Sequence, residues 1–350
     1  MTFRIHFQDP ASEAATALEL LLEASATADR GGAAFAFASD RGVQLLLSDA
    51  AFEKFLERGE FYLVVGVDSI TAPSTLELLG EAEERFRGLT VRAFAHGRPG
   101  TLFHPKLCWF RGAGGGQVFV GSGNLTLGGL LENWEAFCAT RMDGAELDRV
   151  LEDWSGWIES NRANLFPVDE DSVLERARQN EAERRGRGAG HLPRVDDEGR
   201  GELGGSPVLL AEIPRGKDRW NQANFDLETF RTFFQLEPGT QRRVVLLPVA
   251  ANGEIGEPEV RPSVSVRSKN YRIELGQGAG LPYPDGGRPL GVFVRLGSRR
   301  FRYRLILPGQ TGYTELDSFL AGRWSGRAGR MRRVVVDVDE LRSALPEVVV

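Results

Sequence analysis

Residues 101–124 read TLFHPKLCWFRGAGGGQVFVGSGN, and this stretch is the most informative feature of the chain. It joins two apolar, strand-like runs through a glycine-rich turn. A His-x-Lys triplet, His104 to Lys106, lies near its start, and Gly-Ser-x-Asn with Ser122 and Asn124 ends it. Side chains two positions apart on a strand point to the same face, so we expect His104 and Lys106 side by side.

These four residue types suit chemistry at a phosphate group. An imidazole can attack phosphorus or protonate a departing oxygen. The Lys106 ammonium meets phosphoryl oxygens as a compact charge, and the Ser122 hydroxyl and Asn124 amide can donate where negative charge builds up. No Cys/His cluster has the spacing of metal ligands. The sequence therefore predicts a phosphodiester-cleaving site, centred on His104, with neither metal nor cofactor.

Around this stretch, residues 1–165 alternate between helix-like and strand-like patterns, which predicts an α/β layered domain with a mixed sheet and flanking helices. The expected helices are residues 11–28, 49–58 (with Ser48 as N-cap), 74–87 and 144–161. The expected strands are residues 33–37, 61–67, 89–95, 102–110, 117–120 and 134–140. His104 and Asn124 should then lie near the ends of neighbouring strands, a usual place for a site.

The rest of the chain changes character twice. Residues 166–205 are densely charged and then rich in glycine, which predicts a helix running into a linker. Residues 206–350 contain short strands broken by turns, with one helix at 226–234, and predict a mostly-β, barrel-like domain. The expected strands are residues 208–213, 243–248, 263–266, 272–275, 291–296, 299–307 and 332–338.

The charge is distributed unevenly along the chain. The net charge is −6, but residues 206–350 hold 22 Lys and Arg against 16 Asp and Glu, a balance of +6. Residues 1–205 therefore carry −12. An acidic half joined to an arginine-rich half is what a catalytic domain with a separate phosphate-binding domain would show. The alternative is that the arginines form a solvated face or pair with carboxylates.

Several residues of the basic half are candidates for contacts with DNA. Arg300, Arg302 and Arg304 alternate with apolar residues, so one strand face would carry three guanidiniums suited to phosphates or guanine edges. The segment 220–224 is polar and loop-like, with amides that could pair with adenine edges, although such amides more often cap turns. The candidate DNA-binding residues are Arg219, Asn221, Gln222, Asn224, Lys269, Asn270, Arg272, Arg300, Arg302 and Arg304.

The motif of residues 104–124 resembles that of the phospholipase D superfamily, whose signature is His-x-Lys followed by Gly-Ser-x-Asn. One departure is that the Asp five residues beyond the family's lysine falls here on Arg111. Some nucleases of the superfamily lack that Asp and use a Glu about a dozen residues after the Asn. By this resemblance Glu135 is the fifth catalytic candidate, expected to orient His104 through its second ring nitrogen.

Residues 217–225, 268–271 and 288–293 resemble the C-terminal DNA-binding domain of certain restriction endonucleases, a pseudobarrel related to plant auxin-response-factor domains. Together the two halves resemble metal-independent type IIS restriction enzymes of the phospholipase D superfamily, the BfiI type. The resemblance implies a sequence-specific double-stranded DNA endonuclease with a phosphohistidine intermediate. Since the chain has a single His-x-Lys unit, we expect a homodimer with one composite site. A cognate DNA methyltransferase would protect the host.

Three other functions stay open at this point. A phage-defence nuclease of low sequence specificity would share all these features, as would a phospholipid phosphodiesterase or an inactive DNA-binding protein. The phospholipid reading is weakened because no run of about 18 apolar residues could span a membrane. The chain starts without a charged-then-apolar leader, and Cys108 and Cys138 lie in apolar runs, so we expect a cytoplasmic protein with reduced thiols.

Overall fold

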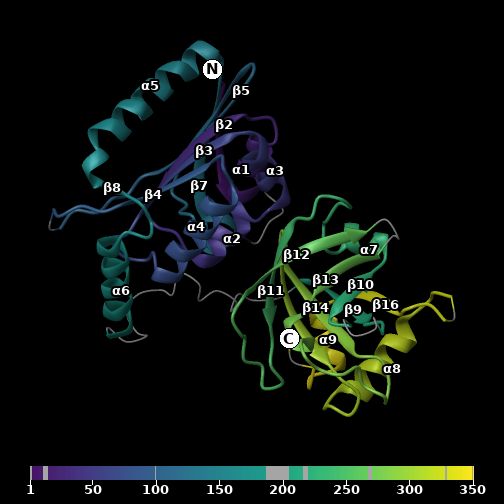
Figure 1. The fold of residues 1–350 in the computed structure, drawn as a ribbon. Coiled ribbons are helices and arrows are strands. Elements are labelled where there is room, and N and C mark those ends of the chain that lie inside the picture. Colours follow the sequence, from purple (N-terminus) through teal and green to yellow (C-terminus); the bar gives the residue numbers. More distant parts are fainter. Residues whose placement is uncertain are drawn as a thin grey trace. The chain divides into compact units, whose positions relative to one another are not determined.

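The computed structural model describes residues 2–10, 15–98, 100–186, 205–215, 220–266, 270–327, 329–348 and 350. The chain divides into two compact units, residues 1–198 and 199–350. Each unit has its own eight-stranded sheet among the described residues (Figure 1). No helix in the described part of the chain is both long and apolar enough to cross a membrane.

The sheet of the first unit has the strand order β1-β7-β6-β5-β2-β3-β4-β8. Its strands are β1 (Thr2–Gln8), β2 (Arg30–Phe35), β3 (Glu60–Gly66), β4 (Leu89–Phe94), β5 (Lys106–Gly112), β6 (Gly115–Gly121), β7 (Glu135–Met142) and β8 (Leu165–Phe166). β2, β3 and β4 run parallel, and β5, β6 and β7 are antiparallel neighbours. The β5–β6 hairpin pairs Leu107 with Val120 and thereby brings the two motif pieces together.

Helices cover both faces of this sheet (Figure 1). The helices are α1 (Ala17–Ser25), α2 (Asp40–Leu47), α3 (Ala50–Arg58), α4 (Pro73–Arg85), the short η1 (Gly128–Glu132), α5 (Gly144–Ser160), η2 (Arg162–Asn164) and α6 (Asp171–Gly186). α1 to α4 lie on one face and α5 on the other. Beneath α3, the rings of Phe52, Phe55, Phe61 and Phe110 pack with centroids 5.2–6.3 Å apart. Such aromatic pairs stabilise a core beyond their buried area.

The first unit departs from the sequence prediction in three places. Strand β1 and helix α2 have no predicted counterpart. Ser48 is not the N-cap of α3: it ends α2, and the Asp49 side chain caps α3 by accepting from the Ala51 amide at 3.0 Å. Strand β5 begins only at Lys106, because His104 and Pro105 form the extended segment that leads into it. α6 is the charged helix expected at the start of residues 166–205, and it lies in the first compact unit.

The sheet of the second unit has the order β10-β13-β12-β11-β15-β14-β9-β16, and only β11 and β15 among these neighbours are parallel. Its strands are β9 (Pro207–Glu212), β10 (Gln222–Phe225), β11 (Arg243–Pro248), β12 (Glu259–Val266), β13 (Asn270–Glu274), β14 (Leu290–Gly297), β15 (Arg300–Ile306) and β16 (Arg333–Asp337). The Arg333 guanidinium on edge strand β16 donates to the carbonyl of Asn224 on the opposite edge, at 2.7 Å, and pairs with Asp226. The sheet is therefore curled until its edges meet.

Two apolar clusters stabilise the second unit, one on each side of the curled sheet. The inner cluster includes Phe293, Phe301 and Tyr303 together with Phe234, which follows α7 (Leu227–Thr232). The outer cluster packs α8 (Tyr313–Arg323) and α9 (Val338–Ala344) against β9 and β14. The expected barrel-like sheet is confirmed as a curled sheet, but α8 and α9 have no predicted counterpart. The segment 220–224 was predicted as a loop, but its residues 222–224 lie in β10.

A buried carboxylate links strands of the second unit. Glu212, at the end of β9, is 4% exposed and accepts from Arg332 at 2.8 and 3.0 Å and from Arg288 at 2.9 Å. Burial alone would raise the pKa of Glu212, but the hydrogen bonds from Arg332 outweigh it and hold that pKa below its ordinary value. Two of the basic half's arginines are thus structural.

Candidate active site

His104 is held between two anchored backbone positions. The Phe103 amide donates to Oδ2 of Asp68 at 2.7 Å. On the other side, the Pro105 carbonyl accepts from the Ala36 amide at 2.8 Å, which continues the pairing of β5 with β2. The His104 side chain is exposed, and its ring packs edge-on against Phe37 with centroids 5.8 Å apart. The backbone is thus fixed while the imidazole faces outward, as a nucleophile requires.

Asp68, which sequence reasoning missed, supports this segment from below. Its side chain is 1% exposed and contacts His96 Nε2 at 3.3 Å and the Arg176 guanidinium at 2.6 Å. Arg176 lies on α6 and also donates to the His96 carbonyl at 3.0 Å. This network connects α6 to the segment that carries His104. The sequence signal was a carboxylate directly after a buried strand, but the partner 108 residues away is not visible in a sequence.

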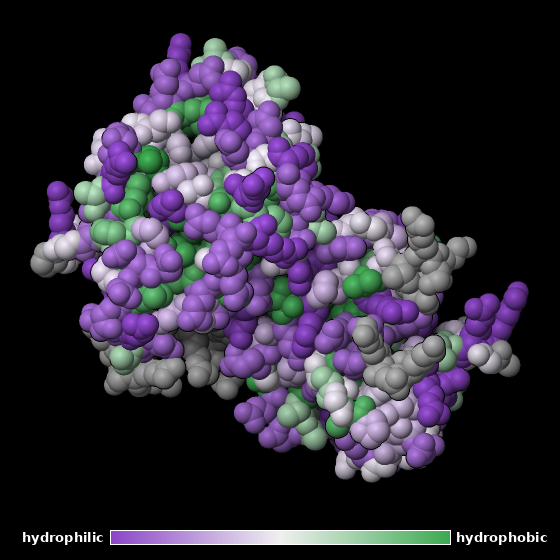
Figure 2. All heavy atoms as spheres, in the orientation of Figure 1, coloured by the Kyte–Doolittle hydropathy of each residue, from purple (hydrophilic) through white to green (hydrophobic). Residues whose placement is uncertain are grey.

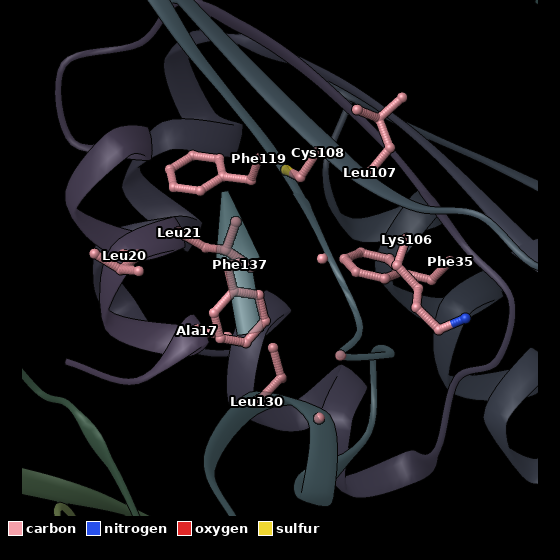
Figure 3. A pocket seen from close by; sticks show the side chains of 13 residues that line it. Ala17, Leu20, Leu21, Phe35, Lys106, Leu107, Cys108, Phe119, Leu130 and Phe137 are labelled. Atoms are coloured by element: carbon pink, nitrogen blue, oxygen red, sulfur yellow. The ribbon is translucent and has the colours of Figure 1, made fainter. Parts of the chain in front are cut away.

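Lys106 lies against His104, as the motif predicts. Its Nζ is 3.0 Å from His104 Nδ1, 3.2 Å from Nε2 and 3.2 Å from the His104 carbonyl. Figure 3 shows the lysine stem beside Phe35 at an apolar cavity of about 30 Å³, with Nζ pointing away from it. Burial, followed by the Lys106 charge, lowers the pKa of His104 below its ordinary value. A lowered pKa favours the neutral imidazole, which is the form that can act as a nucleophile.

Asn124 and Ser122 follow the end of β6 and are fixed by backbone contacts. Asn124 Oδ1 accepts from the Phe37 amide at 3.2 Å, which leaves the amide nitrogen as a donor. The Ser122 amide donates to the Ala136 carbonyl at 3.1 Å. A side chain at Gly129 would come within 2.4 Å of the Asn124 backbone, so only glycine lets η1 pack this closely. Both polar groups thus belong to rigid strand ends.

Glu135 begins β7, the strand next to β6. Its carboxylate accepts from the Ser122 hydroxyl and from Asn133 Nδ2, the latter at 3.4 Å. Burial lowers the pKa of Lys106 below its ordinary value, and the Glu135 charge only partly offsets this by raising that pKa. In the described structure the carboxylate contacts Ser122 rather than His104, whose ring nitrogens face Lys106. Its expected role in orienting His104 therefore stays a prediction.

Arg111, which stands at the superfamily's Asp position, lies at the far end of β5 from Lys106. It forms an ion pair with Asp148 on α5. Among the described residues no group of three or more His, Cys, Asp or Glu side chains is placed to hold a metal ion. Arg111 therefore belongs to the packing of α5 and not to the cluster around His104.

The three arginines of β15 point to one face, as their alternation predicts, but that face is mostly covered. Arg302 is 7% exposed and Arg304 5% exposed, on the side where α8 and α9 pack. Burial, then the nearby Arg300 and Arg342, lowers the pKa of Arg302 to about 10. The open stripe of guanidiniums expected from the sequence is thus corrected to a cluster of positive charge in which Arg302 and Arg304 are buried and Arg300 is partly exposed.

The other DNA-binding candidates fall into two groups. The first group lies at neighbouring strands: Gln222 and Asn224 are on β10, Asn221 immediately precedes it, and Arg272 is on β13. Asn224 stands opposite Arg272 in the strand register. The Asn224 side chain accepts from the Tyr271 amide at 3.0 Å, so it also holds the sheet together. Arg219 and Lys269 and the side chain of Asn270 lie outside the described residues. In the sheet, β12 and β11 separate β13 from β15.

Comparisons with known proteins give similarity only at the level of structure. No protein-family model matches the sequence, and no curated protein matches it. The chain is similar in structure to Nuc from Salmonella typhimurium, a phospholipase D family member, with 16% identity and a TM-score of 0.34, over 47% of this chain and 95% of that chain.

Two structures from Helicobacter pylori are similar to a comparable extent. NucT has 13% identity and a TM-score of 0.33, over 47% of this chain and 99% of that chain. The N-terminal domain of LlaJI.R1 has 13% identity and a TM-score of 0.27, over 37% of this chain and 97% of that chain. All three likenesses thus span less than half of this chain and nearly all of the other.

Proposed function

We propose that this chain is a metal-independent endonuclease of the phospholipase D superfamily that cuts double-stranded DNA at specific sequences. One observation supports it above all: the His104 imidazole, whose pKa is lowered by burial and by the Lys106 charge, lies 3.0 Å from the Lys106 ammonium, and the hairpin places Ser122 and Asn124 at the neighbouring strand end. That is a nucleophile next to a fixed cation and neutral donors, the set that phosphodiester cleavage needs without a metal.

The reaction proceeds in two displacements. One His104 nitrogen forms a bond to phosphorus while the P–O bond to the leaving nucleoside breaks, and a second imidazole protonates the departing oxygen. Lys106 and the Asn124 amide stabilise the charge on the phosphoryl oxygens in the transition state. Water, deprotonated by the second imidazole, then attacks phosphorus and breaks the N–P bond. His104 is regenerated, and the DNA keeps the phosphate.

The second imidazole is His104 of a second copy of the chain. The side of the sheet that α5 only partly covers exposes four large apolar side chains: Phe3 58%, Ile5 56%, Phe7 70% and Val120 53%. We call these four residues the apolar strip. Phe7 pairs with Ala136 and Val120 with Cys138, so the strip continues directly into the Ser122–Glu135 end of the site. The surface of the first unit shows apolar side chains among polar ones (Figure 2).

Burying this strip against the same strip of a second copy gives a two-fold interface. The interface abuts the site, so the two-fold axis brings both His104 residues to one phosphate. An unpaired edge strand such as β1 is otherwise a liability for aggregation. We therefore propose a homodimer with one composite active site.

The second unit holds the DNA in this proposal. It is a pseudobarrel of the plant-type DNA-binding class, and the candidates Asn221, Gln222, Arg272 and Arg300 reach bases or phosphates, as do Arg219, Lys269 and Asn270. The buried Arg302 and Arg304 add positive potential rather than direct contacts, since little of their surface is open. A restriction enzyme of this kind requires a cognate DNA methyltransferase that protects the host's own sites.

Cleavage in the absence of divalent metal tests the function. Incubated with unmethylated phage DNA in EDTA, the purified protein should give discrete fragments on a gel, because no step uses a metal. Sequencing of the fragment ends would give the site. A smear would replace the restriction role by a defence nuclease of low specificity. DNA left intact in EDTA but cut after addition of Mg²⁺ would contradict the His104 mechanism.

The pH profile tests the state of His104. As a nucleophile one His104 must be neutral, so kcat/KM should rise with pH through the His104 pKa, and it should fall again at higher pH because the second His104 must be protonated to act as the acid. Because that pKa is lowered, the midpoint of this rise should lie below the ordinary value of about 6.5. In Lys106→Met, which removes one of the two lowering causes, the midpoint should move up while the rate falls. An unchanged midpoint would show that the titrating group is another one.

A further inference from the structure

A cleft of about 710 Å³ opens beside His104, between α5, the sheet and the segment that joins β4 to β5. The chemistry above does not use it. Its volume is that of a pocket for a molecule of nucleotide size. Its walls include the side chains of Phe94, Phe103, Trp109, Trp154 and Trp157, and His104 lines one end. A ligand in this cleft is therefore in contact with the attacking residue.

The aromatic rings of the cleft lie in a layered arrangement. The Phe94 and Phe103 rings stack with centroids 4.2 Å apart and planes at 14°. The Trp157 ring is also nearly parallel to them, at 14° to Phe94 and 25° to Phe103. Trp157 is half-buried, so part of its ring is open to the cleft. Parallel faces suit a flat ring that slides alongside them, whereas a cage for a quaternary ammonium would turn its faces inward from several directions.

Polar groups at the rim fit the rest of a nucleotide. The exposed Arg98 guanidinium has no ion-pair partner among the described residues and can meet a phosphate. The side chain of Asn164 makes no hydrogen bond within the described part of the chain and can read a base edge. The Asp153 carboxylate, also at the rim, repels phosphate and accepts from ring or exocyclic N–H groups. A base in the cleft with its phosphate at His104 satisfies all three.

We propose that this cleft binds the nucleobase next to the scissile phosphate, stacked on Trp157 and turned out of the DNA helix. The inference rests on the proposed function for its phosphate, but the cleft itself is a separate feature. Turning a base out of a duplex has an unstacking cost, which stacking on aromatic side chains offsets. An acyl chain is disfavoured because the walls are flat rings with amide and carboxylate groups at the rim.

Binding of mononucleotides by the full-length chain tests this. By calorimetry, dAMP or dTMP should bind about 5- to 150-fold more tightly than deoxyribose 5-phosphate, the range expected for one stacked base. Trp157→Ala should bind both alike, and Trp157→Phe should keep most of the difference. Trp324→Phe, in the second unit, is the matched control and should behave like the parent. Val150→Trp adds bulk to the wall of the cleft while keeping Trp157 and should also abolish the difference.

Three outcomes would overturn the proposal. One is equal binding of nucleotide and sugar phosphate by the parent chain. Another is a folded Val150→Trp variant that keeps the preference for the nucleotide. The third is phosphocholine binding as tightly as dAMP, which would point to a lipid headgroup. A parent chain that cuts DNA but shows no base preference keeps the nuclease and loses the cleft proposal. A chain that prefers dAMP yet cuts no DNA keeps the cleft as a nucleotide site and loses the proposed nuclease function.

Discussion

Replacing His104 by alanine should lower the rate of DNA cleavage by at least about 1,000-fold, because the variant has no group that can attack phosphorus. The protein should stay folded and bind DNA as before. The His104 side chain is exposed, and its main packing contact is the edge of Phe37. Cleavage assays with saturating DNA, together with a gel-shift titration and a thermal melt, separate lost chemistry from lost structure.

His6→Ala is the matched control for this variant. His6 lies on β1, is partly exposed, and stands opposite Phe137 in the sheet with no part in the phosphate chemistry. Its cleavage rate should match the parent's. After acid-free quenching with labelled DNA, the parent should show a covalent phosphoprotein that His104→Ala lacks. A His104→Ala enzyme that cuts at the parent's rate would exclude His104 as the nucleophile.

The sequence predicted the site's geometry because the motif fixes it locally. His104 and Lys106 are two residues apart. The hairpin turns at Gly112 and Gly115, and only 14 residues lie between Lys106 and Gly121, where Gly-Ser-x-Asn begins. Local pairing therefore determines which side chains meet. The Asp68–Arg176 contact joins residues 108 positions apart, and such contacts depend on packing that no local pattern encodes.

The differences in secondary structure have two physical causes. Phe3, Ile5 and Phe7 alternate with polar residues, so the signal for β1 was present in the sequence and the prediction missed it. β10 is different: Ala223 and Phe225 face the inner cluster, and two apolar residues in four do not distinguish a strand from a turn. Tertiary pairing with β13 makes this segment a strand.

For the arginines of β15, the sequence predicted the shared strand face correctly but predicted their exposure wrongly. Alternation places Arg302 and Arg304 on one face, and the structure agrees. Burial of that face depends on α8 and α9, which follow later in the chain and which the sequence pattern did not reveal. Charge alone favours an exposed face, since lone arginines are rarely buried. The exposure of Arg302 and Arg304 therefore depends on α8 and α9, which lie later in the chain.

Replacing Ile5 by aspartate should convert the protein to a monomer and remove most of its cleavage activity. The Ile5 side chain is 56% exposed on the apolar strip, so a carboxylate there costs little in the isolated chain. In a two-fold interface, by contrast, it would bury two unpaired charges next to each other. In the proposed composite site the second imidazole comes from the second copy, so activity should disappear with the dimer. Light scattering and cleavage rates at several protein concentrations measure both.

Arg4→Asp places the same carboxylate on the other face of β1 and is the matched control for Ile5→Asp. It should leave the mass and the cleavage rate as in the parent, because the strip is untouched. An Ile5→Asp protein that remains dimeric would locate the interface elsewhere on the first unit. A monomeric Ile5→Asp protein that still cuts DNA at the parent's rate would exclude a composite site, because one copy would then hold every catalytic group. Loss of both properties together ties the apolar strip to the second imidazole, a link that the His104 variant alone cannot establish.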